Sequence, residues 1–201
     1  MANRCRIAIT AAITLLCTVS GMAAPEKAVF AGGCFWGVEA VFEHVKGVID
    51  VRSGYAGGTA ETANYDTVTR GTTDHAESVE IVYDAAKVTF EQLLMIFFAV
   101  AHDPTQVDRQ GPDVGRQYRS VILYADESQR KAAENFVAAV NNAKAFDRPV
   151  ATQVLPLAKF FEAEKYHQDY VRNNPTDPYV VVNDLPKLKA LREKFPSQYR
   201  K

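Results

Sequence analysis

The sequence has no excess of charge of either sign. Its 201 residues include 23 lysines and arginines and 24 aspartates and glutamates, which gives a formal net charge of -1 at pH 7. A protein that binds nucleic acid mainly through its charge carries a basic surface, so we expect no nucleic-acid partner. Internal repeats and low-complexity tracts are absent too, and 47% of the residues are hydrophobic. This composition excludes disordered, collagen-like and coiled-coil chains and is sufficient for one folded domain.

A metal-binding pattern is also missing. The sequence has four histidines, and none of them forms an H-x-x-x-H or comparable metal-ligand spacing. We therefore expect no metal site and interpret the histidines as structural or surface residues. They are His44, His75, His102 and His167.

No apolar run is a convincing membrane span. Residues 7–19 are largely apolar, but the run is too short and too rich in threonine to cross a bilayer. Arg4 and Arg6 precede it, and the small residues of 20–24 follow it. A basic start, an apolar centre and small residues before a cut are typical of a secretory signal peptide.

We therefore predict that residues 1–23 form a cleavable signal peptide and that residues 24–201 form the mature domain. The cut is expected near Ala23 or Ala24. The mature protein would be periplasmic or secreted, without stable insertion in a membrane, and we expect it to be a monomer.

Cysteines are few, and the predicted cut removes two of the three. Cys5 and Cys17 lie in the signal peptide, so the mature chain keeps only Cys34. A lipoprotein built on Cys17 is a weaker alternative, because two leucines precede it where a small residue would be expected. A lone cysteine in an exported protein is a candidate reactive thiol, although chance retention is the alternative.

Cys34 lies in the stretch GGCFWG, between a predicted strand and a predicted helix. The helix is indicated by apolar residues at Val38, Val41, Phe42 and Val45, the spacing of one helix face. The start of a helix favours an anion, so this position predicts a lowered pKa for the Cys34 thiol. The simpler interpretation of a cysteine is a small buried hydrophobic residue.

Strand-like and helix-like segments intermix along the chain, which predicts a single α/β (α+β) domain. Thr89 with Gln92 has the form of a capping box, and Asp126 can cap a long helix. The polar segments 59–75 and 102–117 are long enough to be functional loops. The expected helices are residues 34–46, 89–101, 126–145, 160–171 and 187–194, and the expected strands are residues 28–31, 48–55, 77–83, 118–124 and 150–155.

The strand at residues 77–83 carries an acidic residue on its apolar face. Glu77, Val79, Ile81 and Tyr83 alternate onto one side of this strand. We therefore expect Glu77 to face the core at its rim, where burial would raise the pKa of its carboxyl group.

In GGCFWG and in several further segments given below, the chain resembles the peptide methionine (S)-S-oxide reductases, the A-type methionine sulfoxide reductases. The resemblance covers about residues 27–175. It implies a compact domain in which helices pack on a mixed sheet with a split βαβ (ferredoxin-like) core, and it implies no metal or organic cofactor. Besides GGCFWG, the matching segments are Gly54-Tyr55-Ala56-Gly57-Gly58, Asn64-Tyr65, His75-Ala76-Glu77, Tyr83-Asp84, His102-Asp103-Pro104-Thr105 and Gln117-Tyr118-Arg119-Ser120.

The resemblance assigns expected roles to particular residues. Reduction of a sulfoxide by a thiol needs a nucleophile, an acid for the departing oxygen, donors that hold this oxygen and a pocket for the methyl group. Cys34 is similar to the family's nucleophile and Glu77 to its acid. The remaining residues are Tyr65 and Tyr118 as oxygen donors, Phe35 and Trp36 as walls of the methyl pocket, and Asp113 near the active site without an assigned role.

Each of these residues also has a simpler interpretation. Tyr65 and Tyr118 could donate to backbone carbonyls at the rim of the core. Glu77 could be a solvated charge at the end of a strand, and Trp36 could be part of the core.

The sequence departs from many members of the family near its C-terminus, where they carry further cysteines that resolve the oxidised nucleophile. Residues 174–182 contain no cysteine. After one turnover we expect a sulfenic acid on Cys34 that only an external thiol can reduce. Candidate reductants are thioredoxin, glutaredoxin and small-molecule thiols. The expected substrate is methionine sulfoxide, both as a residue of peptides and proteins and as the free amino acid.

Two other functions remain open from the sequence. A cysteine hydrolase or acyltransferase would need a histidine base beside Cys34, for which His75 and His167 are available. A noncatalytic peptide-binding module could use the aromatic residues alone.

The signal peptide can be tested by the mass of the exported protein. We expect intact-mass spectrometry of the protein recovered outside the cytoplasm to show a chain that starts at Ala24 or Pro25, because the small residues at 21 and 23 suit a signal peptidase. Protein that retains residues 1–23 would contradict the prediction.

Overall fold

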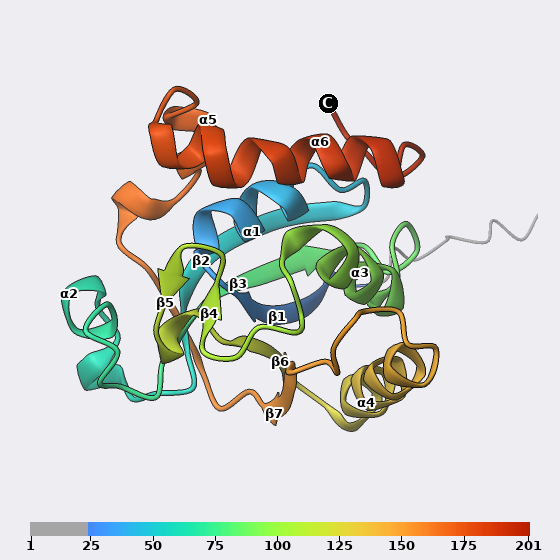
Figure 1. Ribbon diagram of the computed structural model, residues 1–201, viewed down its shortest axis with the longest axis horizontal. Coiled ribbons are helices and arrows are strands. Elements are labelled where there is room, and N and C mark those ends of the chain that lie inside the picture. Colours follow the sequence, from blue (N-terminus) through green and yellow to red (C-terminus); the bar gives the residue numbers. More distant parts are fainter. Residues whose placement is uncertain (1–23) are drawn as a thin grey trace, which may run out of the picture.

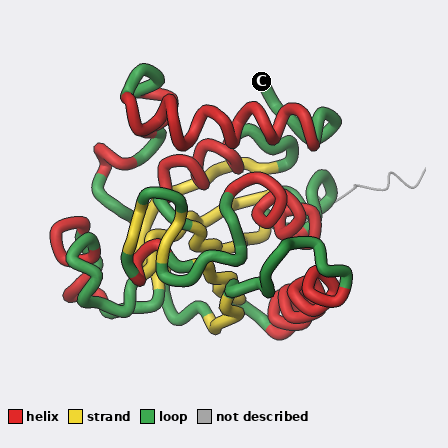
Figure 2. Tube along the Cα trace, in the orientation of Figure 1, coloured by secondary structure: helices red, strands yellow, loops and turns green. Residues whose placement is uncertain are grey.

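The computed structural model describes residues 24–201, so the predicted signal peptide lies outside the described residues. A twisted sheet lies at the centre, and helices cover it (Figure 1), while long loops fill the space between the elements (Figure 2). Within residues 24–201, no helix combines the length and the hydropathy needed to cross a membrane.

The central sheet has six strands and is mostly antiparallel. Only the pair β6 and β7 is parallel. In sheet order the strands are β7 (Gln153–Pro156), β6 (Ser120–Tyr124), β1 (Glu26–Gly32), β3 (Ala76–Tyr83), β2 (Val48–Ala56) and β8 (Phe160–Glu162).

The four inner strands form the split βαβ core that the family resemblance implies. Strand β1, helix α1 (Phe35–Glu43) and strand β2 make one unit, and β3 lies between the two strands, antiparallel to both. Helix α3 (Phe90–Ile96) then connects β3 to β6, which pairs with the free side of β1. This order of strands and helices is the ferredoxin-like arrangement, and the expected fold class is confirmed.

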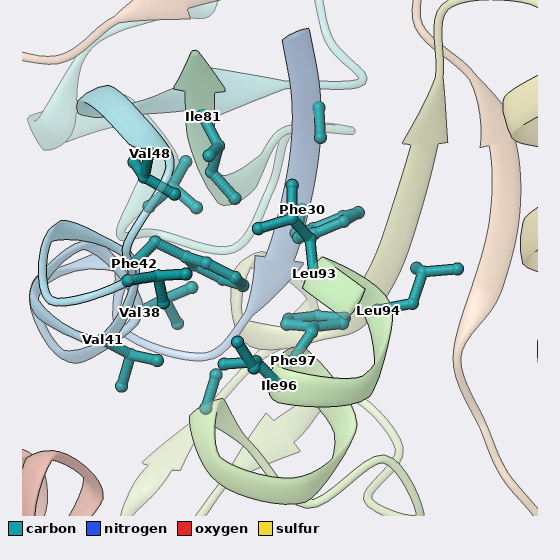
Figure 3. Packing of buried hydrophobic residues seen from close by; sticks show 14 of the residues in the cluster. Phe30, Val38, Val41, Phe42, Val48, Ile81, Leu93, Leu94, Ile96 and Phe97 are labelled. Carbon is teal, nitrogen blue, oxygen red and sulfur yellow. The ribbon is translucent and has the colours of Figure 1, made fainter. Parts of the chain in front are cut away.

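The main core lies between one face of this sheet and the helices α1 and α3. Alternation along β1 directs Ala28 and Phe30 into this core, whereas Val29 and Ala31 pack on the opposite face. Figure 3 shows Phe30 among the apolar side chains of α1, α3 and β3. The ring centroids of Phe30 and Phe97 stack 4.8 Å apart.

Both predicted helix caps are confirmed. The Thr89 side chain accepts from the Gln92 backbone N–H, and the Gln92 side chain accepts from the Thr89 backbone N–H. Asp126 caps α4 (Glu127–Asn142) by accepting from the Gln129 backbone N–H. Helix α3 continues as the π-helical turn η2 (Phe97–Ala101), close to the end predicted from the sequence.

The two polar segments contain short elements that the sequence pattern does not reveal. In the first lie η1 (Ala60–Thr62) and α2 (Tyr65–Val68), and in the second a small hairpin of β4 (Arg109–Gln110) and β5 (Asp113–Val114). The strand predicted from residue 118 begins at Ser120, because residues 116–118 form the turn η3 (Arg116–Tyr118).

The helix predicted for residues 160–171 is wrong. The segment instead forms the edge strand β8, the turn η4 (Lys165–His167) and the short helix α5 (Tyr170–Asn173). Pairing of β8 with β2 and a positive φ of 56° at Asp169 interrupt the helical pattern. The π-helical turn η5 (Val180–Asp184) and α6 (Leu185–Lys194) follow and pack across α1 (Figure 1).

A buried carboxylate connects α1 to the C-terminal segments. Glu39 is 1% exposed, and its two oxygens accept from the backbone N–H groups of Ser53 at 3.2 Å and Asp169 at 3.0 Å. Burial, reinforced by the charge of Glu43, raises the pKa of Glu39 to about 8. Glu39 therefore holds β2 and the start of α5 on the same helix that follows Cys34.

We expect Glu39→Gln to lower the free energy of unfolding by about 1–3 kcal/mol, because an amide leaves one buried N–H without an acceptor. The loss should shrink as the pH rises from about 4.5 to about 8, because in this range Glu39 ionises in the unfolded chain and stays protonated in the folded chain, which destabilises the folded wild type. Urea unfolding measured at pH 6 and pH 9 checks both statements. Glu193→Gln on the exposed side of α6 is the control, and an equal loss there would contradict the assignment.

Candidate active site

Cys34 lies at the junction between β1 and α1, where it is the residue that precedes the first turn of the helix. Gly33 has a φ of +92°, which a side chain disfavours, and a Cβ there would lie 2.6 Å from the Cβ of Gln110. The glycine therefore allows the hairpin of β4 and β5 to approach the junction closely. The Cys34 side chain remains 9% exposed.

Gly37, in the first turn of α1, is the second glycine that a close approach requires. A Cβ at Gly37 would collide with the Asp184 carboxylate and the Lys187 ammonium group. These two groups form an ion pair at 3.1 Å in which Asp184 is completely buried. Gly37 thus allows a charged pair from the C-terminal segments to lie against the helix just beyond Cys34.

Glu77 is buried beside the start of α1, as its place in the strand pattern predicts. Its side chain is 2% exposed, and one oxygen accepts from the backbone N–H of Phe35 at 3.1 Å. Burial is the main reason that the pKa of Glu77 rises to about 8, and the negative charge of Asp113 adds to it, while the Phe35 N–H acts in the opposite direction. Glu77 therefore holds a proton at neutral pH and can act as an acid.

The lowered pKa predicted for Cys34 is wrong for the resting site. Burial raises the pKa of the thiol well above its usual value, and the charges of Glu77 and Asp184 raise it further. The backbone N–H of Trp36 and the Lys187 ammonium group oppose these effects but do not outweigh them. The helix start does favour the thiolate, yet desolvation is the larger effect at this depth.

Tyr65 is held by a carboxylate from the C-terminal part of the chain. Its backbone N–H donates to Glu164 at 2.9 Å, and the other oxygen of Glu164 accepts from the Tyr55 hydroxyl at 2.8 Å. Four tyrosine hydroxyls in residues 24–201 donate to carboxylates, and those of Tyr65 and Tyr118 are not among them. Both hydroxyls therefore remain available to a ligand.

One cavity of about 310 Å³ brings all seven predicted site residues together. Burial is the main cause of a raised pKa for both Tyr65 and Tyr118, with the charge of Glu77 next, so their hydroxyls are protonated donors. The cavity is lined by Cys34, Phe35, Trp36, Tyr65, Glu77, Asp113 and Tyr118, together with Asp177 and Tyr179.

The aromatic wall of this cavity is fixed by the C-terminal segments. The Trp36 ring stacks on Tyr170 with centroids 3.6 Å apart, and its indole N–H donates to His167 at 3.1 Å. His167 in turn packs against the Phe35 ring at 5.0 Å. Trp36 is partly exposed and lies at the cavity edge, so it is not simply a core residue.

Sequence reasoning missed Tyr179 and Asp177. The Tyr179 hydroxyl donates to Asp113, and the Tyr179 ring meets Trp36 edge-on with ring centroids 5.9 Å apart. Asp177 accepts from the Tyr179 backbone N–H at 2.8 Å. Both residues lie in the segment that the sequence analysis considered only for its lack of cysteine, and their pattern gave no further signal.

The histidines available for a hydrolase are engaged elsewhere. The Nε2 of His75 lies 2.9 Å from the Thr59 carbonyl, and the Nδ1 of His167 accepts from Trp36. In residues 24–201 no hydrogen bond joins either imidazole to Cys34, and no group of three or more possible metal ligands is present. Glu77 therefore places a carboxylic acid in the same cavity as Cys34, whereas neither His75 nor His167 acts as a hydrogen-bonded base to it.

A larger cavity, of about 480 Å³, lies elsewhere and does not reach Cys34. It is lined mainly by charged side chains, and its Arg172 already pairs with Glu43 and Asp169. The smaller cavity is therefore the candidate active site, because it contains Cys34, Glu77 and the hydroxyl-bearing Tyr65 and Tyr118.

Comparison with known proteins gives consistent matches. A family model described as peptide methionine sulfoxide reductase matches residues 26–199. The peptide methionine sulfoxide reductase MsrA 2 of Synechocystis sp. is 55% identical over 175 residues, which cover 87% of this chain and 82% of that protein.

Solved structures agree with this match. Methionine sulfoxide reductase A of Corynebacterium diphtheriae superposes with a TM-score of 0.67 at 36% identity and covers 78% of each chain. Reduced Mxr1 of Saccharomyces cerevisiae gives a TM-score of 0.70 at 30% identity, over 77% of this chain and 88% of that one. Mxr1 has also been solved in complex with Trx2, a form that resembles this chain in fold alone.

We expect Glu77→Gln to lower the pKa of the Cys34 thiol, because it removes one of the two carboxylates whose charge opposes the thiolate. Glu77 ionises only above about pH 8, so the two proteins should differ at higher pH. The rate of Cys34 alkylation by iodoacetamide, followed against pH, should reach its midpoint at a lower pH in the variant. Glu80→Gln on the same strand should leave the midpoint unchanged, and an unshifted midpoint in Glu77→Gln would contradict the coupling.

Proposed function

Because this chain belongs to the peptide methionine sulfoxide reductase family, and so is an oxidoreductase that reduces methionine sulfoxide, we propose that Cys34 is its nucleophile and Glu77 its acid. The proposed substrate is the S epimer of methionine sulfoxide, in peptides and proteins and as the free amino acid. The observation that carries the proposal is the single cavity shared by Cys34, Glu77, Tyr65 and Tyr118.

The geometry suits each part of a methyl sulfoxide. The oxygen of the substrate would lie toward the protonated Glu77 carboxyl and the hydroxyls of Tyr65 and Tyr118. A hydrogen-bond donor placed at a developing negative oxygen contributes about 3 kcal/mol to the transition state. The methyl group would lie against Phe35 and Trp36, which form the apolar wall.

The reaction oxidises Cys34 and reduces the substrate by two electrons. The Cys34 sulfur attacks the sulfoxide sulfur and forms a transient S–S bond, and the bond between the sulfoxide sulfur and its oxygen breaks. The oxygen then bonds to the Cys34 sulfur as the S–S bond breaks, which releases methionine. Glu77 donates a proton to the oxygen as it departs, and the proton released by the thiol restores Glu77. The products are methionine and a Cys34 sulfenic acid. Loss of the Glu77 proton above about pH 8 would therefore slow this step.

The order of ionisation follows from the buried site. A thiolate beside an ionised Glu77 would place two negative charges in one desolvated cavity, which raises the cost of both. Protonated Glu77 removes this repulsion and supplies the acid at the same time. The Lys187 ammonium group and the Trp36 N–H then favour the thiolate.

Asp113 holds one wall of the cavity in place. It accepts from the Tyr179 hydroxyl, and its charge is one cause of the raised pKa of Glu77. We propose that Asp113 acts by keeping Glu77 protonated and Tyr179 oriented, and that it makes no bond to the substrate.

An external thiol is proposed to regenerate the enzyme. Cys34 is the one free cysteine found in residues 24–201, so these residues offer no second thiol to the sulfenic acid. The complex of Mxr1 with Trx2 supports a reductant of the thioredoxin class. Glutaredoxin or a small-molecule thiol would serve the same chemistry.

The place of action is proposed to be outside the cytoplasm. Arg4, Arg6 and the apolar residues 7–19 support export through a cleaved signal peptide. The substrates would then be oxidised proteins of the periplasm or of the surroundings, and a monomer suffices, because one chain supplies all the residues around the cavity.

A single-turnover experiment tests the proposal. We expect protein mixed with methionine S-sulfoxide, without reductant, to release one methionine per chain and to gain about 16 Da, one oxygen atom, on Cys34. The R epimer and the Cys34→Ser variant should give neither product. Equal reaction of both epimers, or turnover by Cys34→Ser, would refute the proposal. A disulfide between two chains would refute the recycling scheme.

A further inference from the structure

Cys34 lies between two cavities. The first is the cavity of about 310 Å³ that contains Glu77 and Tyr118. The second, of about 380 Å³, also reaches Cys34 but is lined by residues of β4, of the end of η2 and of the start of α6. We name it the second cavity, and it is lined among others by Gly32, Cys34, His102, Gln106, Asn183 and Lys187.

A hydrogen-bonded pair separates the two spaces. Asp113 and Tyr179 line both cavities, and the Tyr179 hydroxyl donates to the Asp113 carboxylate. Cys34 is the third residue that both cavities share. Cys34 therefore borders both cavities, and the Asp113–Tyr179 pair lies on the same shared boundary.

The second cavity lacks the groups that reduce a sulfoxide. Burial lowers the pKa of His102 to about 4, so the imidazole is neutral. The Asp103 carboxylate accepts from Thr105 and from Gln106, and its pKa is lowered. Neither residue can act as the carboxylic acid that Glu77 provides in the first cavity.

The second cavity does carry a positive group near the sulfur. Lys187 is 22% exposed in its side chain, pairs with the buried Asp184 carboxylate, and keeps two of its three N–H donors for other partners. One oxygen of Asp184 has no hydrogen-bond partner in the described residues, and the other accepts from the Lys187 ammonium group at 3.1 Å. An ammonium group in this position favours an anionic sulfur that approaches Cys34.

The direction of the second half-reaction follows from the first. The oxygen transferred to Cys34 must lie in the first cavity, where Glu77, Tyr65 and Tyr118 receive it. A thiolate that displaces a group from a divalent sulfur approaches in line with the bond that breaks, as in thiol–disulfide exchange. The thiolate must then arrive from a side away from Glu77, and the second cavity reaches Cys34 without Glu77 in its lining.

We propose that the second cavity is the docking site for the reductant, and that it receives a cysteinyl thiol of a peptide or of an exposed protein loop. This inference rests on the proposed function. A volume of about 380 Å³ lies in the range of small-molecule sites and is sufficient for a cysteine with its flanking backbone.

The chemistry balances with groups that are present. The incoming thiolate forms a disulfide bond with the Cys34 sulfur, the bond between that sulfur and its oxygen breaks, and Glu77 protonates the departing hydroxide to water. A second thiol from the reductant then attacks the mixed disulfide, which frees Cys34 as a thiol and leaves the reductant as a disulfide. The water leaves through the first cavity, while the reductant occupies the second.

We test the site by filling it. Asn183→Trp places a large ring in the second cavity, and Val182→Trp, on the neighbouring residue that is 70% exposed, is the matched control. Two steps are measured separately: the single-turnover release of methionine without reductant, and the reaction of the preformed Cys34 sulfenic acid with a thiol. Glutathione and thioredoxin are the two thiols used.

For Asn183→Trp we expect methionine release within about twofold of the wild type and a fall of about tenfold or more in the reaction with thiol, because the nucleophile can no longer align with the sulfur. Val182→Trp should be unchanged in both steps. A loss with glutathione alone identifies a small peptide thiol as the ligand, and a loss with thioredoxin alone identifies a protein loop.

Two results for Asn183→Trp would overturn the inference. One is an unchanged reaction of the sulfenic acid with both thiols. The other is an equal loss of methionine release and of the reaction with thiol, which would mean that the substrate and the reductant use the same cavity. Failure of the wild type to release methionine would instead refute the proposed function. If Asn183→Trp does not fold, Gln106→Trp fills the same cavity from the other side, and Val107→Trp, at a residue 71% exposed, is its control.

Discussion

The structure depends on one buried hydrogen bond, from the backbone N–H of Phe35 to the Glu77 carboxyl group. The first N–H groups of a helix have no partner within the helix, and here a side chain from β3 supplies one. The bond fixes the start of α1, and hence Cys34, relative to the sheet. Because the acceptor is buried, it also holds a proton up to about pH 8. A single contact thus positions Cys34, the proposed nucleophile, and holds Glu77, the proposed acid, beside it.

The remaining contacts hold α1 from the opposite side. Glu39 binds the backbone at the start of α5, His167 accepts from Trp36, and the pair of Asp184 and Lys187 lies on Gly37. These partners belong to the last third of the chain, which contributes little to the sheet. Its role is to cover the helix that carries the reaction and to complete the walls around it.

The placement of charge supports the proposal that the reaction and the recovery use different cavities beside Cys34. The first cavity contains a protonated carboxyl and two hydroxyls, which suit a departing oxygen, whereas the second contains Lys187, which suits an incoming anion. Burial keeps the Cys34 thiol protonated in the absence of substrate, so an oxidant that reaches it meets the thiol and not the more reactive thiolate.

The sequence by itself determined the helix caps at Thr89 and Asp126 and the burial of Glu77, because alternation and capping are local properties of a few adjacent residues. The split βαβ core was expected from the family resemblance and not from any local pattern. Only the tertiary structure decided the pKa of Cys34, the strand in place of a helix after residue 160, and the part played by Tyr179. Desolvation and long-range pairing depend on which distant segments cover a residue. No local pattern records that.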